Sequence, residues 1–454
     1  MSTTTLEKPT TSAAVTPYLT DWEAFTASLG RGEPEALRML RKEGLERFSS
    51  QGFPTLKQED WRFTDVSAVA QGSFRRATGA VPVTSRALEP FVFDGALRLV
   101  FVDGFYSAEL SNLIALPEGA YVGSLAEALT EHPDRALEHL GRRARTADNP
   151  FVALNTAFLR DGALISLPAN AVIEAPIHLL YMSSDAATDS EAIVSYPRNL
   201  IVAGENSQAT VVETYAGLGP GRYFSCSVTE VVAAPNAVVD HYKVQHESHE
   251  AFHLATLQIY QERSSNFFSH SVSTGGALTR NDVNAVLDAE GIECTLNGLY
   301  MVTGEQHVDN HMRMDHAKPH CNSYELYKGI LDGRSRAVFN GRIYVHPNAQ
   351  KTDAKQSNRN LLLSEGAIAN SQPQLEIFAD DVRCTHGSTV GQLDEEAVFY
   401  LRSRGIGAEA ASSLLTYAFA SDIVQRIKVP DVRRDLEEFL FTRLPRGEVV
   451  RQAV

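Results

Sequence analysis

Cysteine is scarce in this sequence: the 454 residues contain four, Cys226, Cys294, Cys321 and Cys384, and no two of them form a CxxC pair. So few thiols cannot build a disulfide framework, and the missing pairs exclude the usual ligand spacing of zinc sites. The chain also lacks a run of about 18 apolar residues and a charged-then-apolar start, the patterns of a membrane span and of a signal peptide. We therefore expect a cytoplasmic protein.

Basic segments and catalytic signatures are absent as well. The formal net charge is -15 and no block of five Lys or Arg residues occurs, so the surface should repel nucleic acids and anionic membranes. There is no GxxxxGK[ST] loop, no GxGxxG after a strand and no GxSxG elbow. The sequence thus predicts a protein that is not an enzyme and that binds neither nucleic acid nor membrane.

Composition divides the chain into four parts. Residues 1–18 are rich in Ser, Thr and Pro and are predicted to be disordered. Residues 19–149 mix helical patterns with short strands, and within them GFPTLKQEDWRFTDV (52–66) is polar with two large aromatics, which suggests a docking segment. Helical periodicity returns in residues 391–454. Between these helical parts lies a long block, 150–390, of a different kind.

Residues 150–390 consist of short Val- and Ile-rich runs, broken about every 8–12 residues by Gly, Asn, Asp or Pro, which is typical of an all-β structure. Stacked coils of a β-helix place equivalent residues about 4.8 Å apart, where asparagines can hydrogen-bond to one another. The many internal asparagines therefore favour a β-helix, and a β-sandwich is the alternative because no fixed sequence period is visible. These asparagines are Asn297, Asn310, Asn322, Asn340, Asn358, Asn360 and Asn370.

Two histidine-rich stretches are candidate metal sites. In HVDNHMRMDH (307–316), charged residues and histidines occupy every second position. On a strand they would all point to one side, and they are His307, Asp309, His311, Arg313 and Asp315. Such a row can bind a metal or form a solvated face with cross-strand ion pairs. In HESHEAFH (246–253) the three histidines would share a face only on a helix, whereas the surrounding runs predict strands.

The sharpest local feature is DDVRCTHGSTVG, residues 380–391. Cys384 and His386 are two apart on a predicted strand, so both should project to one face with Cα atoms about 6.5–7 Å apart. A thiolate and an imidazole there could hold iron or one edge of a cluster, and further ligands would have to come from a partner. The alternative is a buried thiol and a hydrogen-bonded histidine inside the stacked coils.

At this point the sequence resembles a known family. The stretch from RNDVNAVLDAEG at residue 280 to DEEAVFYLRSRGI at residue 406 closely resembles the SufB/SufD family of iron–sulfur cluster assembly proteins. The match is specific over roughly 280–425 and continues more weakly through NPFVALNTAFLRDGALISLP and the segment 52–66. The form DDVRCTHGSTVG, and the absence of a CxxCxxxC motif near the N-terminus, are more similar to the SufD type than to the SufB type.

The resemblance implies a right-handed parallel β-helix (150–390) between helical subdomains, acting as a non-catalytic scaffold subunit. It implies a SufB-like partner bound through the β-helix and a SufC-like ATPase bound through the C-terminal helices, in a complex of one SufB, one SufD and two SufC. His386 matches a candidate cluster ligand at the SufB–SufD interface, and Cys384 lies beside it. The chain alone would bind no cofactor, and a cluster would be shared transiently with the partner.

The C-terminal helices are the expected ATPase-binding surface, although they could equally cap the end of the coils. The residues expected to contact that partner are Tyr400, Leu401, Arg404, Leu414, Leu415 and Tyr417. ATP binding would then move the helices at 393–430 and shift the SufB–SufD interface.

Two other functions stay open at the level of sequence. A β-helix enzyme acting on acidic polysaccharide would need convergent carboxylates, but Asp380 and Asp381 are adjacent and would point to opposite faces of a strand. A homodimeric scaffold working without a SufB-like partner is the second alternative.

Overall fold

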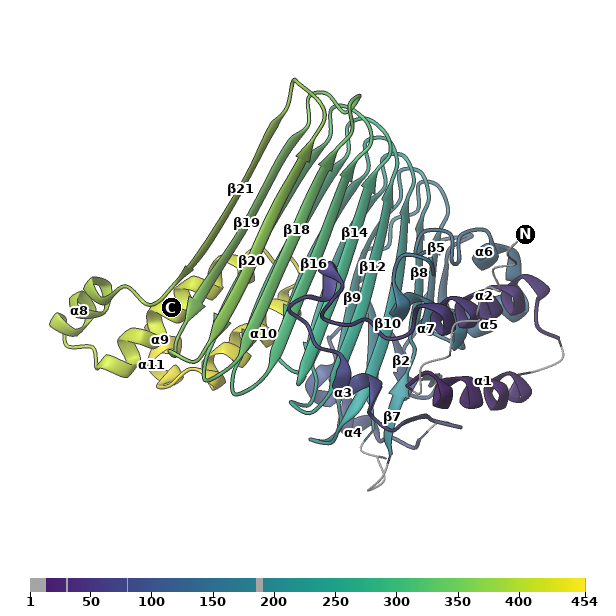
Figure 1. Cartoon of the computed structure of the whole chain (residues 1–454), viewed down its shortest axis with the longest axis horizontal. Helices are drawn as coiled ribbons and strands as arrows, with labels where there is room; N and C mark the ends of the chain where they lie inside the picture. Colours follow the sequence, from purple (N-terminus) through teal and green to yellow (C-terminus); the bar gives the residue numbers. More distant parts are fainter. Residues whose placement is uncertain (1–13, 30–31, 80, 185–190, 454) are drawn as a thin grey trace, which may run out of the picture.

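The computed structural model describes residues 14–29, 32–79, 81–184 and 191–453 (Figure 1). The strands are β1 (Phe74–Arg76), β2 (Leu97–Val102), β3 (Phe105–Tyr106), β4 (Tyr121–Ser124), β5 (Ala163–Leu167), β6 (Ile177–Ser183), β7 (Ala192–Ser195), β8 (Arg198–Ala203), β9 (Gln208–Gly217), β10 (Tyr223–Ala233), β11 (Val238–His246), β12 (Phe252–Gln261), β13 (Asn266–Ser273), β14 (Leu278–Leu287), β15 (Glu293–Val302), β16 (His307–His316), β17 (Asn322–Leu331), β18 (Arg336–Val345), β19 (Asp353–Leu362), β20 (Ile368–Ile377) and β21 (Arg383–Gly391).

Helices stand before and after most of these strands. They are α1 (Thr16–Ser28), α2 (Glu35–Gln51), α3 (Ser67–Ala70), α4 (Ser85–Leu88), α5 (Leu125–Glu131), α6 (Pro133–Leu137), α7 (Pro150–Ala157), α8 (Glu395–Ser403), α9 (Ala408–Val424), α10 (Pro430–Arg443) and α11 (Gly447–Ala453), with single 3₁₀ turns at Glu59–Trp61 and Glu89–Phe91. None of the helices in the described ranges is long and apolar enough to cross a membrane.

Successive strands alternate between two facing sheets. Even-numbered strands from β8 to β20 form most of an 11-stranded sheet, which we call sheet A, and odd-numbered strands from β9 to β21 form most of a 10-stranded sheet, sheet B. Strands of consecutive coils pair in parallel and in register, so each coil stacks on the one before it (Figure 1). This is the predicted β-helix, and a sandwich of antiparallel strands is excluded for this block.

The space between the sheets is the main core. Alternate residues of each strand point into it, as Val308, Met312 and Met314 of β16 do, while Asp309 and Arg313 point out. The core joins aliphatic and aromatic side chains from β2 to β21. Asparagines face inward less often than predicted. Asn310, Asn358 and Asn360 share the parity of the core residues, whereas Asn297, Asn322, Asn340 and Asn370 have the outward parity.

One corner of the coils carries a stack of left-handed backbone residues. Positive φ angles recur in consecutive coils at Asn170, Asn206, Asn236, Ser264, Gly291, His320 and Lys351. Most of their backbone N–H groups donate to a carbonyl of the next coil, as from Asn206 to Pro235 O at 3.0 Å. The Asn236 amide donates to Asn206 and that of Asn206 to Asn170, both at 3.0 Å. The predicted asparagine ladder therefore exists, but at a turn and not only in the core.

The N-terminal part begins earlier than predicted. Residues 1–13 of the expected disordered stretch lie outside the described residues, but α1 starts at Thr16 and buries Tyr18 against Phe48 and Phe53, so disorder to residue 18 is wrong. The predicted part 19–149 also supplies β2 and β4, which pair with strands of sheets B and A. Helices α1, α2 and α7 share one apolar cluster with residues of β10, β12 and β14.

The C-terminal helices form a separate layer on sheet B. Apolar residues of α9 and α10 pack against outward side chains of β11, β13, β15 and β17, including Tyr242, Val272 and Ile330. Lys328 pairs with Asp422 at 2.8 Å and Lys428 with Asp240 at 3.0 Å across this contact. Helix α8 differs from the others, since none of its residues is buried and it extends away from the body (Figure 1).

Candidate functional site

The predicted thiol–imidazole pair lies on β21, the last strand of sheet B. Cys384 is in register with Ala354 and His386 with Gln356, and both of those β19 residues are buried in the core. Residues in register in a parallel sheet share a face, so Cys384 and His386 both project from the inner face, as predicted. Cys384 is partly buried against the core cluster, whereas His386 is exposed because no further coil in the described structure follows β21.

Cys384 and His386 can supply two ligands to an iron–sulfur cluster and no more. The described residues contain no group of three or more His, Cys, Asp or Glu side chains placed to hold a metal ion. Burial, aided by Asp353, raises the pKa of the Cys384 thiol, so metal binding would have to displace its proton. The other three cysteines are buried. These two side chains alone do not supply the four ligands that an iron–sulfur cluster usually has.

Two buried polar residues stand behind His386 in the same inward column. Register joins Glu325 of β17 to Gln356 of β19, and Gln356 to His386. The Gln356 Nε2 donates to Glu325 Oε2 at 2.7 Å, and burial raises the pKa of Glu325 to about 7. Sequence reasoning missed both residues. Their signal is present, because they occupy inward positions in the alternation of NSYELYKGIL and DAKQSNRNLL.

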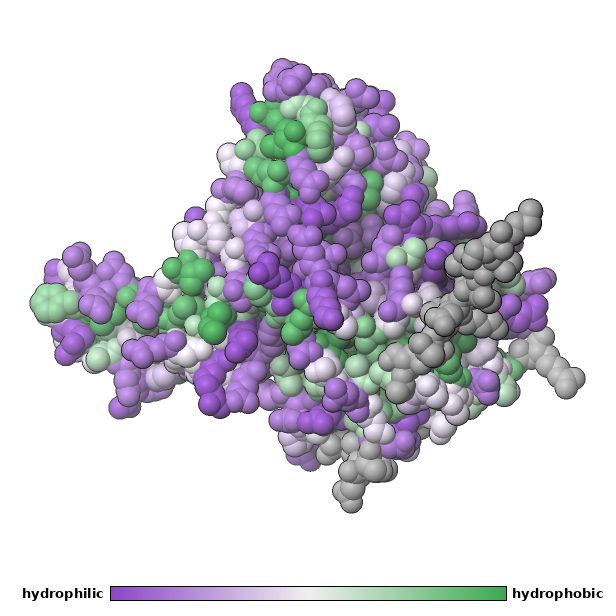
Figure 2. All heavy atoms as spheres, in the orientation of Figure 1, coloured by the Kyte–Doolittle hydropathy of each residue, from purple (hydrophilic) through white to green (hydrophobic). Residues whose placement is uncertain are grey.

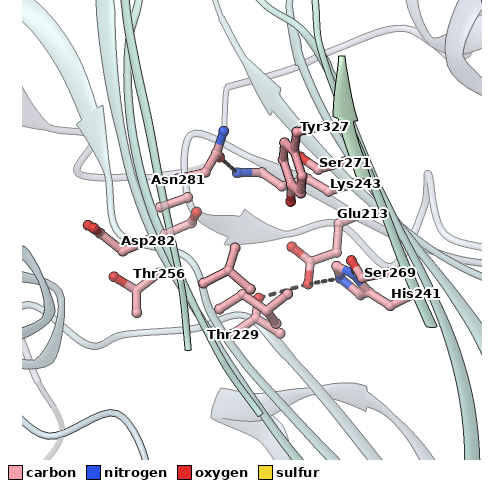
Figure 3. A pocket seen from close by; sticks show the side chains of 14 residues that line it. Glu213, Thr229, His241, Lys243, Thr256, Ser269, Ser271, Asn281, Asp282 and Tyr327 are labelled. Atoms are coloured by element: carbon pink, nitrogen blue, oxygen red, sulfur yellow. Dashed lines mark hydrogen bonds and ion pairs between the residues drawn. The ribbon is translucent and has the colours of Figure 1, made fainter. Parts of the chain in front are cut away.

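The middle coils carry a second polar group inside the core (Figure 3). Glu213 accepts hydrogen bonds from Thr229 at 2.7 Å and from His241 at 3.2 Å, and the buried Lys243 donates to Asn281 at 2.5 Å. Burial alone would raise the pKa of Glu213, but its hydrogen bonds outweigh burial and lower that pKa to about 2. Burial lowers the pKa of Lys243 to about 8. Glu213 and Lys243 thus find hydrogen-bond partners within the coils.

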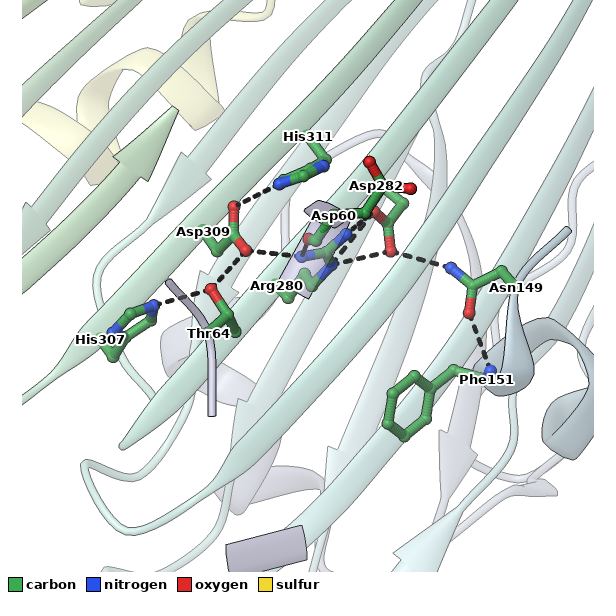
Figure 4. Close-up of polar contacts among 9 residues, drawn as sticks. All are labelled: Asp60, Thr64, Asn149, Phe151, Arg280, Asp282, His307, Asp309 and His311. Atoms are coloured by element: carbon green, nitrogen blue, oxygen red, sulfur yellow. Dashed lines mark hydrogen bonds and ion pairs between the residues drawn. The ribbon is translucent and has the colours of Figure 1, made fainter. Parts of the chain in front are cut away.

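The N-terminal segment covers the histidine-rich strand β16 (Figure 4), and the described side chains there form no group of three or more that could hold a metal ion. Its outward Asp309 accepts from Arg280 at 2.7 Å and from Thr64 at 2.5 Å, while His307 contacts the Thr64 hydroxyl at 3.1 Å. Arg280 also stacks on Trp61, 3.7 Å from the ring centre, and donates to Asp60 O. The segment 52–66 thus docks on sheet A, as predicted.

The histidines of 246–253 are separated. His246 at the end of β11 contacts Asp435 of α10 at 3.0 Å, and His249 contacts Arg443 at 3.4 Å. His253 lies in the core beside Glu247, at 2.8 Å. Among the described side chains these three therefore form no common metal site.

The residues expected to bind the ATPase lie on α8, at Arg404 directly after it, and on α9. Tyr400 and Arg404 are exposed, and Leu401, Leu414 and Leu415 are partly buried. Tyr417 is buried and stacks on Phe441 of α10, with ring centres 5.3 Å apart, so it supports the helix layer from within. Their role in partner binding stays a prediction.

Comparison with known proteins agrees with this architecture. Residues 186–419 match the family described as SUF system FeS cluster assembly, SufBD core domain, and residues 13–179 match the SufBD protein N-terminal region. A Synechocystis protein named as an iron-sulfur cluster assembly SufBD family protein is 33% identical over 91% of this chain and 92% of its own length. The iron-sulfur cluster assembly protein SufD of Escherichia coli is 30% identical over 93% and 96%, respectively.

A third relative comes from a plant. Protein ABCI7, chloroplastic, of Arabidopsis thaliana is 30% identical over 87% of this chain and 84% of its own length. The matched regions together include both the coils and the N-terminal helices, so the likeness covers the fold as well as the β21 motif. The chain therefore belongs to the SufBD family of iron–sulfur cluster assembly proteins.

Proposed function

We propose that this chain is the SufD-type scaffold subunit of an iron–sulfur assembly complex, which supplies His386 and Cys384 to a cluster site shared with a SufB-like subunit. The observation that carries this proposal is the open last coil. It presents a thiol and an imidazole on the inner face of β21, at the end of sheet B where no further strand of the described chain follows. Among the described residues these two ligands have no third beside them, and this fits a cluster site shared between two chains better than a site within one chain.

The partner would pair with the edges of β20 and β21. These strands end sheets A and B, and edge strands offer unpaired backbone groups to another chain. Apolar side chains are exposed there, with Phe378 56%, Val390 49% and Ile368 44% accessible. Hydrophobic atoms gather at the tip where β20 leads into β21 (Figure 2). A strand-pairing partner would cover both the edges and these side chains.

The ATPase would bind α8 and the exposed side of α9. Phe399 and Tyr400 are 71% and 57% exposed on a helix that has no buried residue and extends away from the body (Figure 1). Exposed aromatic residues of this kind are frequent anchors of protein interfaces. Nucleotide binding by that partner would pull on α8 and α9 and move the last coils, where the candidate cluster ligands lie.

Coexpression with a SufB-like and a SufC-like subunit tests the proposal. The iron and acid-labile sulfide of the purified complex should fall strongly with His386→Ala and moderately with Cys384→Ala. Thr385→Ala is the matched control, because Thr385 lies between them and has the outward parity. Unchanged iron in both ligand variants, with the complex intact, would refute the role of this site.

A homodimeric scaffold is the second candidate, because the open edges are also complementary to those of another copy. The polysaccharide-acting enzyme gains no support, since the relatives that match along the chain are named as assembly proteins.

A further inference from the structure

The last three coils of sheet B stack three polar side chains in one inward column. Glu325, Gln356 and His386 are in register on β17, β19 and β21, so neighbouring members are one strand spacing, about 4.8 Å, apart. Glu325 and Gln356 are each 3% exposed, whereas His386 stands at the open end. The column therefore leads from the closed core to the candidate ligand.

The amide of Gln356 is fixed at one end. Its Nε2 donates to Glu325 Oε2 at 2.7 Å, so the nitrogen end of the amide faces Glu325. Gly341 of the facing sheet leaves room for this amide, because a Cβ there would lie 2.3 Å from Gln356 Nε2. The amide is thus held in place by Glu325 and by a neighbour without a side chain.

The other end of the same amide has no partner. Gln356 Oε1 is buried and accepts no hydrogen bond within the described residues. Leaving a buried acceptor unpaired destabilises the fold, so a donor is expected nearby. The next side chain in the column is His386, which carries a ring N–H in either neutral tautomer.

We propose that Gln356 is a positioning residue for His386, with Gln356 Oε1 accepting a hydrogen bond from one imidazole N–H. This inference rests on the proposed function and deepens it. The bond fixes the tautomer and the ring plane, and it leaves the other ring nitrogen free to bind iron at the shared site. A protonated Glu325 Oε1 would be a second donor to Gln356 Oε1. An amide oxygen has two lone pairs, so it can accept this hydrogen bond and the one from the imidazole together.

Proton-detected NMR of the isolated chain with ¹⁵N-labelled histidine rings tests the bond without any metal. A ring N–H that is held in a hydrogen bond exchanges slowly with water and gives a resolved correlation. We expect one such signal to disappear in His386→Ala, which assigns it, and to disappear in Gln356→Leu and Gln356→Met. Glu325→Gln keeps an acceptor for the Gln356 amide and should retain the signal, whereas Glu325→Leu should weaken it.

Asn358→Leu is the matched control, because it removes a buried amide from the next inward position of β19, in register with Ser388. It should leave the His386 signal in place even where it lowers stability. A wild-type chain without a slowly exchanging His386 N–H would overturn the inference, as would a signal that survives in both Gln356 variants.

The complex gives a second and separate readout. With the SufB-like partner present, Gln356→Met should retain less iron than wild type, and the electronic spectrum of the bound cluster should change. If His386→Ala leaves iron content unchanged, the proposed function fails, while the NMR result still decides whether Gln356 holds the imidazole.

Discussion

A buried carboxyl group makes the stability of a protein depend on pH, and Glu325 is such a group. Burial raises its pKa from 4.5 to about 7, so the folded chain binds the proton more tightly than the unfolded chain. Stability is therefore fully present below the unfolded pKa and falls as pH rises toward 7. Glu325→Gln should match wild type near pH 5 and exceed it at pH 8 by about 3 kcal/mol at most.

Urea unfolding at the two pH values measures this difference. Glu305→Gln is the control, since Glu305 is exposed and pairs with the exposed Arg334. Equal pH slopes for wild type and Glu325→Gln would contradict a neutral, buried Glu325.

Arg280 is the second residue whose environment predicts a large effect. It donates to Asp282 and Asp309 and stacks on Trp61, and its guanidinium is buried. Arg280→Ala leaves the buried Asp309 and the partly buried Asp282 without their cation, and breaking a buried ion pair in this way typically costs about 3–5 kcal/mol. The segment 52–66 should also loosen, so trypsin should cut sooner at Lys57 and Arg62. Arg313→Ala, on the same face but exposed, should change neither the unfolding midpoint nor the cleavage rate.

Among elements, the left-handed turn stack makes a clear demand on residue type. Asn236 has a φ of 60° and donates to Asn206. Asn236→Ala should destabilise the chain by about 1–2 kcal/mol, because Ala lacks the short polar side chain that lets Asn adopt this conformation, whereas Gly adopts it freely and Asn236→Gly loses mainly the side-chain bond. Denaturation curves of both variants decide the point. An equal loss in the two would show that the ladder bond and not the φ angle matters.

Helix α8 provides the second prediction for an element. None of its residues is buried, so replacing Phe399 and Tyr400 by Ser should leave folding unchanged. If α8 binds the ATPase, the double variant should weaken that binding at least tenfold, measured by copurification and by titration calorimetry. Arg402→Ala, on the same helix, is the control. Full binding by the double variant would remove α8 from the interface.

The elements also show what sequence can predict. Strict alternation in HVDNHMRMDH correctly assigned the two faces of β16, because a strand has one period whatever surrounds it. The coil repeat was hidden, since equivalent turn residues are 27 apart between Ser264 and Gly291 but 36 apart between Asn170 and Asn206. Coils keep their strands in register while their turns vary in length, so no fixed period survives in the sequence.

The sequence likewise predicted one part of the candidate site and missed another. The shared face of Cys384 and His386 follows from spacing along one strand, which sequence shows directly. The column through Glu325 and Gln356 follows from pairing between strands about 30 residues apart, which only register reveals. Asn340 and other asparagines that face outward were predicted to face the core. The prediction was wrong because the polarity of a residue does not determine whether it lies on the inner or the outer face of its strand.

For the whole molecule, the exposed last coil predicts self-association when no partner is present. The chain purified alone should be a dimer by light scattering, joined through β20 and β21. Phe378→Lys with Val390→Lys places charge among the exposed apolar residues and should give monomers, whereas Val172→Lys, equally exposed at the other end, should not. A monomeric wild-type chain, or a dimer unaffected by the two lysines, would contradict this interface.

The two ends of the β-helix differ in structure, and this difference limits the size of the assembly that the chain can form. At its start the stack ends with the short antiparallel strands β3 and β4, and residues of α2, α5 and α6 form an apolar cluster with β4, β5 and β8, while β20 and β21 stay uncovered at its finish. A stack with both ends bare would polymerise into a fibre. When two chains pair through β20 and β21, no further open edge of this kind remains, so assembly stops at a dimer.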